Sequence, residues 1–249
     1  MSHYIEAEGV ATAGISFIRE HTEAIEPPRA LWVPFELGRP LGAPNEPDFQ
    51  IDVLRTLLRT LDEKHGPVLV DYPHEAPASS SAEEPWACLI PPPPLKPAGS
   101  EAEALSQRLS QEISLLRPWY DESVRSRGRT AVRTSGLTLG DMVSVLAAYA
   151  AGESPHVPSS AAASMPYLLR FLADDLKAYY MEAAAAQPGA SSPSSADLGR
   201  WLFYETALGD VLYRVLGRLT SSEDPKKTWL SGVTGMIVPR AYMQRPGDD

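Results

Sequence analysis

Hydrophobic residues in the first 72 positions alternate between short apolar runs and one helical stripe. The runs "GVATAGISFI" (9–18) and "ALWVPF" (30–35) are β-branched and aromatic, which predicts two short buried strands, although Pro34 cannot donate to a sheet. In residues 47–66, apolar residues recur every three or four positions, which predicts a helix with Pro47 in its first turn and Gly66 as its stop. Two strands make no stable sheet. We therefore expect this segment to pair with a second copy, unless "PVLVDY" (67–72) supplies a third strand in the same chain.

From residue 100 onward the apolar pattern has a helical period. Ser100 followed by Glu103 predicts a capping box at the start of a first helix, and Pro118 is expected to end or kink it. Three more helices are expected at 137–152, 165–189 and 194–219, the second beginning at Pro166 and the first ending at Gly152. Amphipathic helices joined by polar loops are typical of a helical bundle.

Between these halves lies a proline- and serine-rich stretch that includes four consecutive prolines. Such a composition favours an extended connector. We interpret residues 1–72 as an α/β segment, 73–100 as a linker and 101–245 as a helical bundle. The predicted fold class is therefore α+β: two or three strands and a helix, joined by the linker to the bundle.

Composition narrows the classes of partner and compartment. The chain has 249 residues and a formal charge of −10, which argues against a nucleic-acid-binding surface. The N-terminus lacks the basic and apolar regions of a signal peptide, and no stretch approaches the roughly 18 apolar residues of a membrane span. With Cys88 as the one cysteine, no internal disulfide can form. We expect a cytoplasmic protein without membrane or nucleic-acid partners.

Two carboxylates fall on apolar faces of the predicted helices. Asp175 shares a face with Leu168 and Leu172, and Glu205 lies between Trp201 and Leu208. A buried carboxylate needs a partner. One interpretation is a structural ion pair or hydrogen bond, and the other is a polar pocket that performs acid–base chemistry. Four side chains are candidate partners: Arg170, Arg200, Tyr180 and Tyr204.

Charged residues also follow the two predicted strands. In "REHTE", Arg19 and His21 follow the first strand, where α/β proteins bind ligands. Arg39 lies in the glycine-containing loop after the second strand, and with Arg19 and Arg29 it is a candidate carboxylate clamp. The alternatives are a solvated helix start and a structural strand exit.

Motifs for other chemistries are missing. The one Glu-x-x-His match, ending at His156, contains Pro155, so we expect no metal site. No nucleotide-binding loop or hydrolase nucleophile elbow occurs, and we expect no cofactor. Cys88 lies among apolar neighbours and is expected to pack rather than react.

Residues 4–62 resemble the C-terminal end of the selenoprotein B subunits of glycine, sarcosine and betaine reductases, with relatives in D-proline reductase. The resemblance is carried by Gly14-Ile15, by Pro40-Leu41-Gly42-x-Pro44 and by the helix from Pro47. The redox selenocysteine or cysteine motif of that family has no counterpart here, so selenol chemistry is not implied.

Two functions follow from these observations. The first is a small-molecule metabolic enzyme of reductase-like ancestry that acts on an amino-acid-like or amine substrate. Its pocket would lie between the α/β segment and the bundle, with Glu205, Asp175 and His21 as catalytic candidates. Its substrate-binding candidates are Arg39, Arg19, Tyr180 and Tyr204. The second is a non-catalytic binding or assembly protein that forms a homodimer through its N-terminal sheet.

Overall fold

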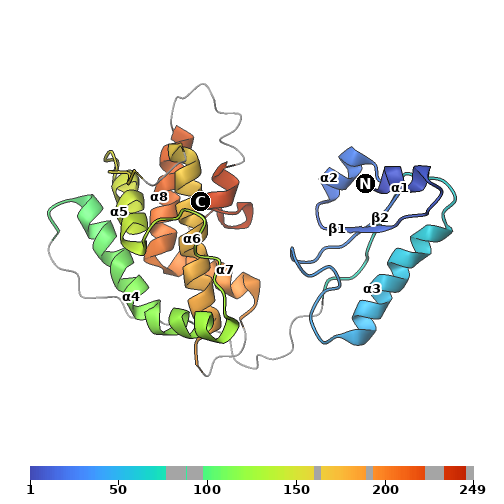
Figure 1. Ribbon diagram of the computed structural model, residues 1–249, viewed down its shortest axis with the longest axis horizontal. Helices are drawn as coiled ribbons and strands as arrows, with labels where there is room; N and C mark the ends of the chain where they lie inside the picture. Colours follow the sequence, from blue (N-terminus) through green and yellow to red (C-terminus); the bar gives the residue numbers. More distant parts are fainter. Residues whose placement is uncertain (77–87, 89–97, 160–163, 189–192, 222–232, 245–249) are drawn as a thin grey trace. The chain divides into compact units, whose positions relative to one another are not determined.

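The computed structural model describes residues 1–76, 88, 98–159, 164–188, 193–221 and 233–244 (Figure 1). Contacts divide the chain into two compact units, unit 1 at Met1–Ser81 and unit 2 at Ala82–Asp249. Unit 1 combines strands and helices, and the described part of unit 2 is helical, so the fold is α+β. The predicted linker at 73–100 lies mostly outside the described residues.

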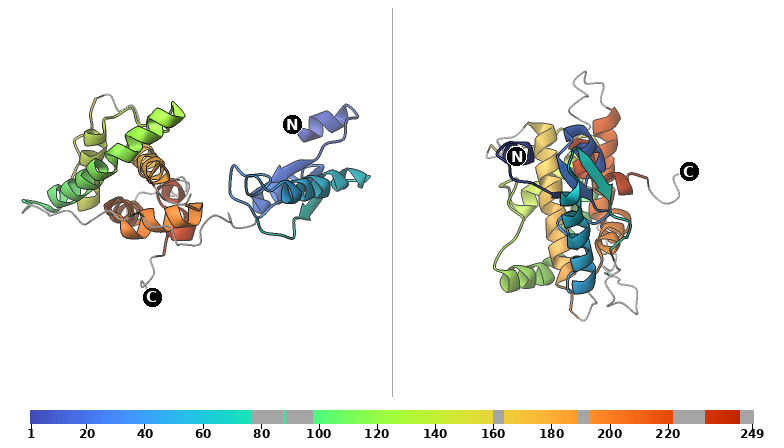
Figure 2. Two further views of the ribbon diagram at one scale, coloured as in Figure 1. Left: turned by 90° about the horizontal axis from the view of Figure 1, so that it is seen from below. Right: turned by 90° about the vertical axis from the view of Figure 1, so that its right-hand side faces the viewer.

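Unit 1 is built on a three-stranded parallel sheet in the order β1-β2-β3. Its strands are β1 (Gly14–Ser16), β2 (Arg29–Trp32) and β3 (Val68–Asp71). Its helical segments are α1 (Ser2–Ala7), α2 (Arg19–Ile25), α3 (Pro47–Arg59) and the 3₁₀ turn η1 (Thr60–Asp62). The ribbon views show α3 running alongside the sheet (Figures 1 and 2).

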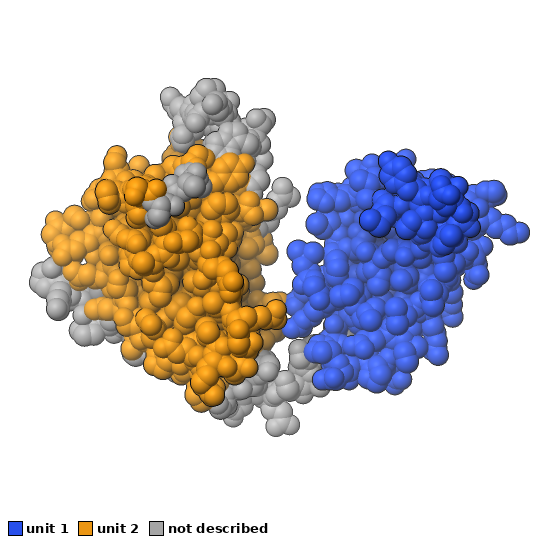
Figure 3. All heavy atoms as spheres, in the orientation of Figure 1, with its two compact units in different colours: residues 1–81 blue, residues 82–249 orange. Residues whose placement is uncertain are grey.

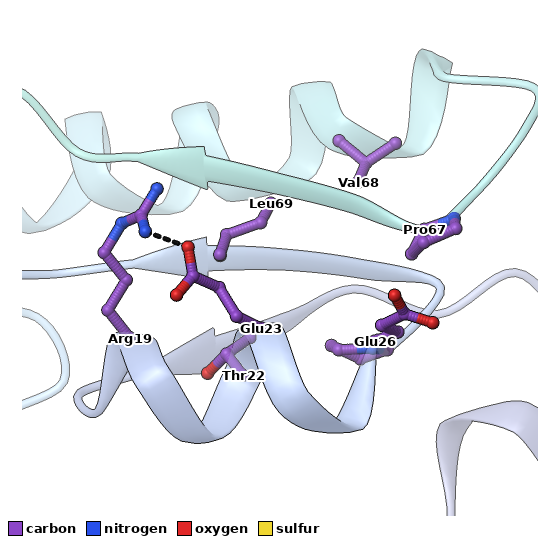
Figure 4. Close-up of a pocket in the computed structure, with 8 residues that line it drawn as sticks. Arg19, Thr22, Glu23, Glu26, Pro67, Val68 and Leu69 are labelled. Carbon is purple, nitrogen blue, oxygen red and sulfur yellow. Dashed lines mark hydrogen bonds and ion pairs between the residues drawn. The ribbon is translucent and has the colours of Figure 1, made fainter.

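Side chains alternate between the two faces of the sheet along each strand, and the two faces have different neighbours. Ile15, Leu31 and Val70 stand in register across the three strands, and Leu31 is completely buried. They join Val53 of α3 in the hydrophobic core of unit 1, so α3 packs on this face. The opposite face carries Leu69 of β3 and is bordered by α2 (Figure 4).

The third strand comes from the same chain. Val68–Asp71 pairs with β2 along its whole length, as the "PVLVDY" alternative requires. The first two strands are shorter than the apolar runs that predicted them. Beyond Trp32, only the Val33 amide still donates to the Ser16 carbonyl, and the next residue, Pro34, has no N–H to continue the ladder. The sheet therefore does not need a second copy to gain a third strand.

Unit 2 contains five long helices among its described residues. They are α4 (Glu101–Arg127), α5 (Leu139–Ala151), α6 (Met165–Ala185), α7 (Ser195–Glu205) and α8 (Ala207–Ser221). A helical turn at 233–237 and the 3₁₀ turn η2 (Arg240–Tyr242) follow. Helix α6 contacts α4, α5, α7 and α8, and it lies at the centre of this unit (Figures 1 and 2).

Several helix ends follow the local rules that predicted them. Ser100 accepts a hydrogen bond from the Glu103 amide at the start of α4, and Gly152 ends α5 in a left-handed conformation (φ 91°). Of the two alternatives predicted for Pro118, an end and a kink, the end is wrong, because α4 continues through this residue to Arg127. The predicted single helix at 194–219 is also wrong, because Thr206 is extended (φ −107°, ψ 156°) and separates α7 from α8.

Each of the two units coloured in Figure 3 has its own hydrophobic core, as the contacts of the buried residues show. The core of unit 1 is small and centres on Leu31, Val33 and Val53. The core of unit 2 is larger and surrounds α6, whose Tyr179 and Tyr180 rings are fully buried. The two cores share no residue.

Candidate functional site

A groove in unit 1 lies on the sheet face that α2 borders, and it has a volume of about 360 Å³ (Figure 4). Helix α2 forms one side of it, and the segment leading into β3 forms the other. Its lining residues are Arg19, Thr22, Glu23, Glu26, Pro27, Pro67, Val68 and Leu69. The groove thus combines an apolar wall from the start of β3 with a polar wall from α2.

An ion-pair network crosses one end of the groove. Arg19, the first residue of α2, donates through Nε to both carboxylate oxygens of Asp71, at 3.1 and 3.2 Å. It also pairs with Glu23 one turn later on α2. The hydrogen bond and charge of Asp71, with the charge of Glu23, raise the pKa of the Arg19 guanidinium despite some desolvation. Asp71 ends β3, so this network lies at the carboxyl ends of parallel strands, where open α/β sheets bind ligands.

The groove carries more negative than positive charge. Glu23 and Glu26 line the groove with one guanidinium, that of Arg19, and Asp71 and Glu23 both pair with Arg19, whereas Glu26 lies at the other end, near Pro67 (Figure 4). Within the described part of the chain, no ion pair or hydrogen bond holds the Glu26 carboxylate. Its side chain is therefore available to a cation in solution or to a ligand.

Glu26 also adopts an unusual backbone conformation. It follows α2 with φ 43° and ψ 58°, a left-handed conformation that costs a residue other than glycine about 1–2 kcal/mol. Glycine and asparagine are the common residues at this helix-ending position. A glutamate there keeps a carboxylate at the groove in spite of that cost. Strained residues of this kind cluster at functional sites.

The candidate residues of unit 1 are only partly brought together. Arg19 lines the groove, as expected of a ligand-binding residue at a strand end. His21 is exposed on α2 and is not one of the lining residues. Arg39 is exposed and lies 3.6 Å from Glu36, in the loop after β2. Arg29 is buried, and neither Arg29 nor Arg39 lines the groove with Arg19.

Asp175 is completely buried in unit 2, and its partners differ from those expected. It accepts hydrogen bonds from the backbone amides of Arg133, Thr134 and Ser135 at 3.1, 2.7 and 2.8 Å. The Ser135 hydroxyl donates a fourth at 2.6 Å. Asp175 therefore anchors the loop between α4 and α5, which fits the structural interpretation of this residue.

The expectation that Glu205 is buried is wrong. Glu205 is exposed at the last position of α7, where the chain turns into extended Thr206. The apolar stripe that predicted its burial does not continue through this break. Its neighbour Tyr204 is half-buried and donates to the Gln244 carbonyl at 3.3 Å.

The buried carboxylate next to Tyr180 is Glu112 of α4, which was not among the candidate residues predicted from the sequence. Tyr180 donates to Glu112 Oε2 at 2.9 Å, and the Ala207 amide donates to both carboxylate oxygens at 2.8 and 2.9 Å. Glu112 thus caps the first turn of α8. Burial raises its pKa, and the Ala207 and Tyr180 hydrogen bonds oppose that rise. Glu112 lies seven residues after Leu105 on the apolar stripe of α4, so the reasoning applied to Asp175 could have found it.

Cys88 is buried, as its apolar neighbours predicted. Burial, with the nearby carboxylates of Glu205 and Glu112, raises the pKa of the thiol to about 12. The thiol is therefore protonated at neutral pH. A protonated, buried thiol is a poor nucleophile.

Among the described residues, no group of three or more His, Cys, Asp or Glu side chains is placed to hold a metal ion. No helix in that part of the chain has the length and apolarity needed to cross a membrane. No family model, curated protein or solved structure matches this chain.

Proposed function

We propose that this protein binds a small molecule carrying an amino group, such as an amino acid, in the groove between α2 and β3. The observation that carries the proposal is that two carboxylates, Glu23 and Glu26, line the groove with one guanidinium, that of Arg19. A ligand ammonium would bind Glu26 and Glu23, and a ligand carboxylate would approach Arg19. The volume of about 360 Å³ suits a molecule of that size.

The proposed ligand belongs to the class expected from the sequence, but the proposed site differs from the expected pocket between the α/β segment and the bundle. The ligand remains an amino acid or amine, as the resemblance to the reductase subunits implies. The pocket is proposed within unit 1, formed by α2 and the segment at β3. Asp175 and Tyr180 are left out of it, because their polar atoms already bind within unit 2. On this proposal the chain recognises the substrate of an enzyme of small-molecule metabolism.

Titration calorimetry with paired ligands tests the proposal. Alanine and lactate differ in the ammonium group, as do ethylamine and ethanol. We expect the amino compounds to bind and the hydroxyl compounds to bind at least tenfold more weakly, since a lost charged contact is worth about 1.4 kcal/mol or more. Equal binding of both members of each pair, or binding of neither, would count against the site.

Matched variants locate the binding. Glu26→Gln and Glu23→Gln should each weaken binding of the amino compounds about fivefold to tenfold by removing one charge from the groove. Glu20→Gln is the control, because Glu20 is exposed on the same helix and does not line the groove. Equal weakening by the control would place the effect in the overall charge of unit 1.

A second candidate function is assembly, with no catalytic role for the chain. The observation that favours it is a row of exposed aliphatic side chains on α3, since contiguous exposed apolar surface marks interaction sites. The two functions separate in one experiment. An assembly protein would associate in solution while binding none of the paired ligands.

A further inference from the structure

The end of α4 and the loop that follows it are rich in arginine. Residues 125–133 contain four arginines and no acidic residue, in a chain that has 32 acidic and 22 basic residues. Arg125 pairs with Glu122 at 2.6 Å. The other three arginines are exposed, and within the described part of the chain no ion pair or hydrogen bond holds their side chains. We call them the arginine patch: Arg127, Arg129 and Arg133.

The loop that carries most of the patch is held against α6 by two carboxylates. Glu182 accepts hydrogen bonds from the Thr130 hydroxyl and the Ala131 amide, both at 2.8 Å. Asp175, which is completely buried, accepts from the backbone amides of residues 133–135. These bonds use backbone and hydroxyl groups on the inner side of the loop. The arginine side chains are left on the solvent side.

The two anchors also keep the guanidinium groups close together. They are seven residues apart on α6, which is about 10 Å along the helix. The chain from Arg127 to Arg133 can span at most about 20 Å. The exposed residues between the arginines are Gly128 and Ala131, which have no large side chain. The arginine patch is therefore one compact, positively charged surface on a loop of fixed position.

We propose that the arginine patch is an interaction surface for a short acidic segment of a partner protein. Guanidinium groups bind carboxylates through paired, parallel hydrogen bonds. Asp175 and Glu182 already accept hydrogen bonds from the loop, and neither forms an ion pair with the patch. The three guanidinium groups thus have bonding capacity that the described part of unit 2 does not use. A loop that is already held in place also loses little freedom when it binds a partner.

The size of the patch favours an acidic protein segment over a nucleic acid or a membrane. Proteins that bind DNA tightly neutralise roughly 6–10 phosphates, and the patch has too few cations for that. The chain as a whole has a formal charge of −10, which repels any polyanion that extends beyond the patch. A short segment with a few Asp or Glu side chains contacts the patch alone.

Fluorescence anisotropy of the full chain with labelled peptides tests the proposal. The probe is an octapeptide of alternating Glu and Ser, and its control has Gln in place of each Glu. At about 0.05 M salt we expect the acidic peptide to bind at least about tenfold more tightly than the control peptide, and at about 1 M salt the difference should vanish because exposed charges are screened. The patch belongs to unit 2 and the groove to unit 1, so this result does not depend on ligand binding in the groove.

Matched variants locate the binding. Arg129→Gln and Arg133→Gln should each weaken binding of the acidic peptide about twofold to fivefold, as expected for one exposed ion pair. Replacing all three arginines of the patch by Gln should weaken it at least about tenfold. Arg200→Gln is the control, because Arg200 is exposed on α7 and has no ion pair with any described residue. Circular dichroism checks that every variant is folded.

Equal binding of the acidic peptide and its Gln control, or binding of neither, would overturn the proposal. Weakening by Arg200→Gln as large as that by Arg133→Gln would also overturn it, since the attraction would then come from the overall charge of unit 2. A DNA duplex of about 20 base pairs and phosphatidylglycerol vesicles are tested at the same salt concentration. Tighter binding of either one than of the acidic peptide, lost when the patch is replaced, would assign the patch to a phosphate-bearing surface instead.

Discussion

At the residue scale, the carboxylate of Asp175 shows how a buried charge is accommodated in unit 2. Its four hydrogen bonds come from residues 133–135, so one side chain holds the loop between α4 and α5 against α6. Charged hydrogen bonds of this kind replace the hydration that burial removes. The residue therefore contributes to stability, and its oxygen atoms are already occupied.

We predict that Asp175→Ala lowers the free energy of unfolding by about 2–3 kcal/mol, because the loop amides lose a charged acceptor. Glu205→Ala is the comparison, at an exposed carboxylate where the change should stay within about 0.5 kcal/mol. Urea denaturation followed by circular dichroism measures both. Equal effects of the two substitutions would contradict the assignment of Asp175 as the buried anchor.

Glu112 leads to a prediction about pH. Its pKa is raised in the folded protein by burial, so the folded state holds this proton more tightly than the unfolded state does. The stability that it contributes is complete below the unfolded pKa, near 4.5, and is lost as the pH rises through the raised value. Glu112→Gln removes this titration. We therefore expect the stability of the wild type relative to Glu112→Gln to fall as the pH rises from 4.5 toward neutrality.

Denaturant unfolding at a series of pH values measures this difference. Glu122→Gln is a control on the same helix, because Glu122 is exposed and pairs with Arg125 at the surface. That substitution should leave the slope of stability against pH nearly unchanged. A wild type that gains stability relative to Glu112→Gln over the same range would show that the hydrogen bonds outweigh burial.

The burial of some carboxylates could be predicted from the periodic spacing of apolar residues along a helix. The phase of 165–189 placed Asp175 correctly on a buried face, because α6 is continuous across that region. The same reasoning gave the wrong result for Glu205. The extended backbone at Thr206 ends helix α7, so the helical spacing no longer relates Glu205 to the residues of α8. Hydrogen-bond partners such as the 133–135 loop come from distant sequence. The periodicity of one helix contains no information about them.

At the element scale, the junction of α7 and α8 depends on a close approach of two backbones. A methyl group on Gly209 of α8 would lie 2.5 Å from the Leu202 carbonyl oxygen and 2.6 Å from that of Phe203. Both oxygen atoms belong to α7, so neither can rotate away as a side chain would. The tight turn at Thr206 therefore requires glycine at this position.

Two glycines of α8 form a matched pair for testing this contact. Gly209→Ala should destabilise the protein by about 1–3 kcal/mol, because the backbone of α7 must shift to admit the methyl group. Gly217→Ala meets no atom within 4 Å and should stabilise the helix by about 1 kcal/mol, since alanine is the better helix former. Thermal unfolding of both variants checks the opposite signs. A stabilising Gly209→Ala would mean that the helices are farther apart.

The presence of most helices and strands was predictable from the sequence, whereas the division between α7 and α8 was not. Capping residues and proline positions located the start of α4 at Ser100, the end of α5 at Gly152 and the start of α3 at Pro47. The division at Thr206 was missed because no glycine or proline marks it. Instead, the Thr206 hydroxyl accepts from the Gly209 amide at 3.0 Å and begins a new helix within an unbroken apolar pattern.

At the scale of the whole molecule, the two units follow from where apolar residues gather along the chain. The strands and α3 of unit 1 surround a small core, and the helices of unit 2 surround a larger one. The apolar pattern changes from mixed to helical periodicity near residue 100, and contacts divide the chain between residues 81 and 82. The groove could not be anticipated in the same way, because it requires residues near 19–27 and 67–69 to meet across the parallel sheet.

Separate cores predict separate responses to core substitutions. Leu31→Ala removes a fully buried side chain from the centre of the sheet, which costs about 2–5 kcal/mol. A domain of this size has only a few kcal/mol of stability, so we expect unit 1 to be largely unfolded in this variant. Unit 2 should keep its stability, because its core includes no residue of unit 1. Hydrogen exchange read by mass spectrometry measures both units in the intact chain.

Leu176→Ala, at a fully buried position of α6, is the reciprocal variant and should reduce protection in unit 2 while leaving β2 and α3 protected. Loss of protection in both units from either substitution would show that the two cores fold as one cooperative structure.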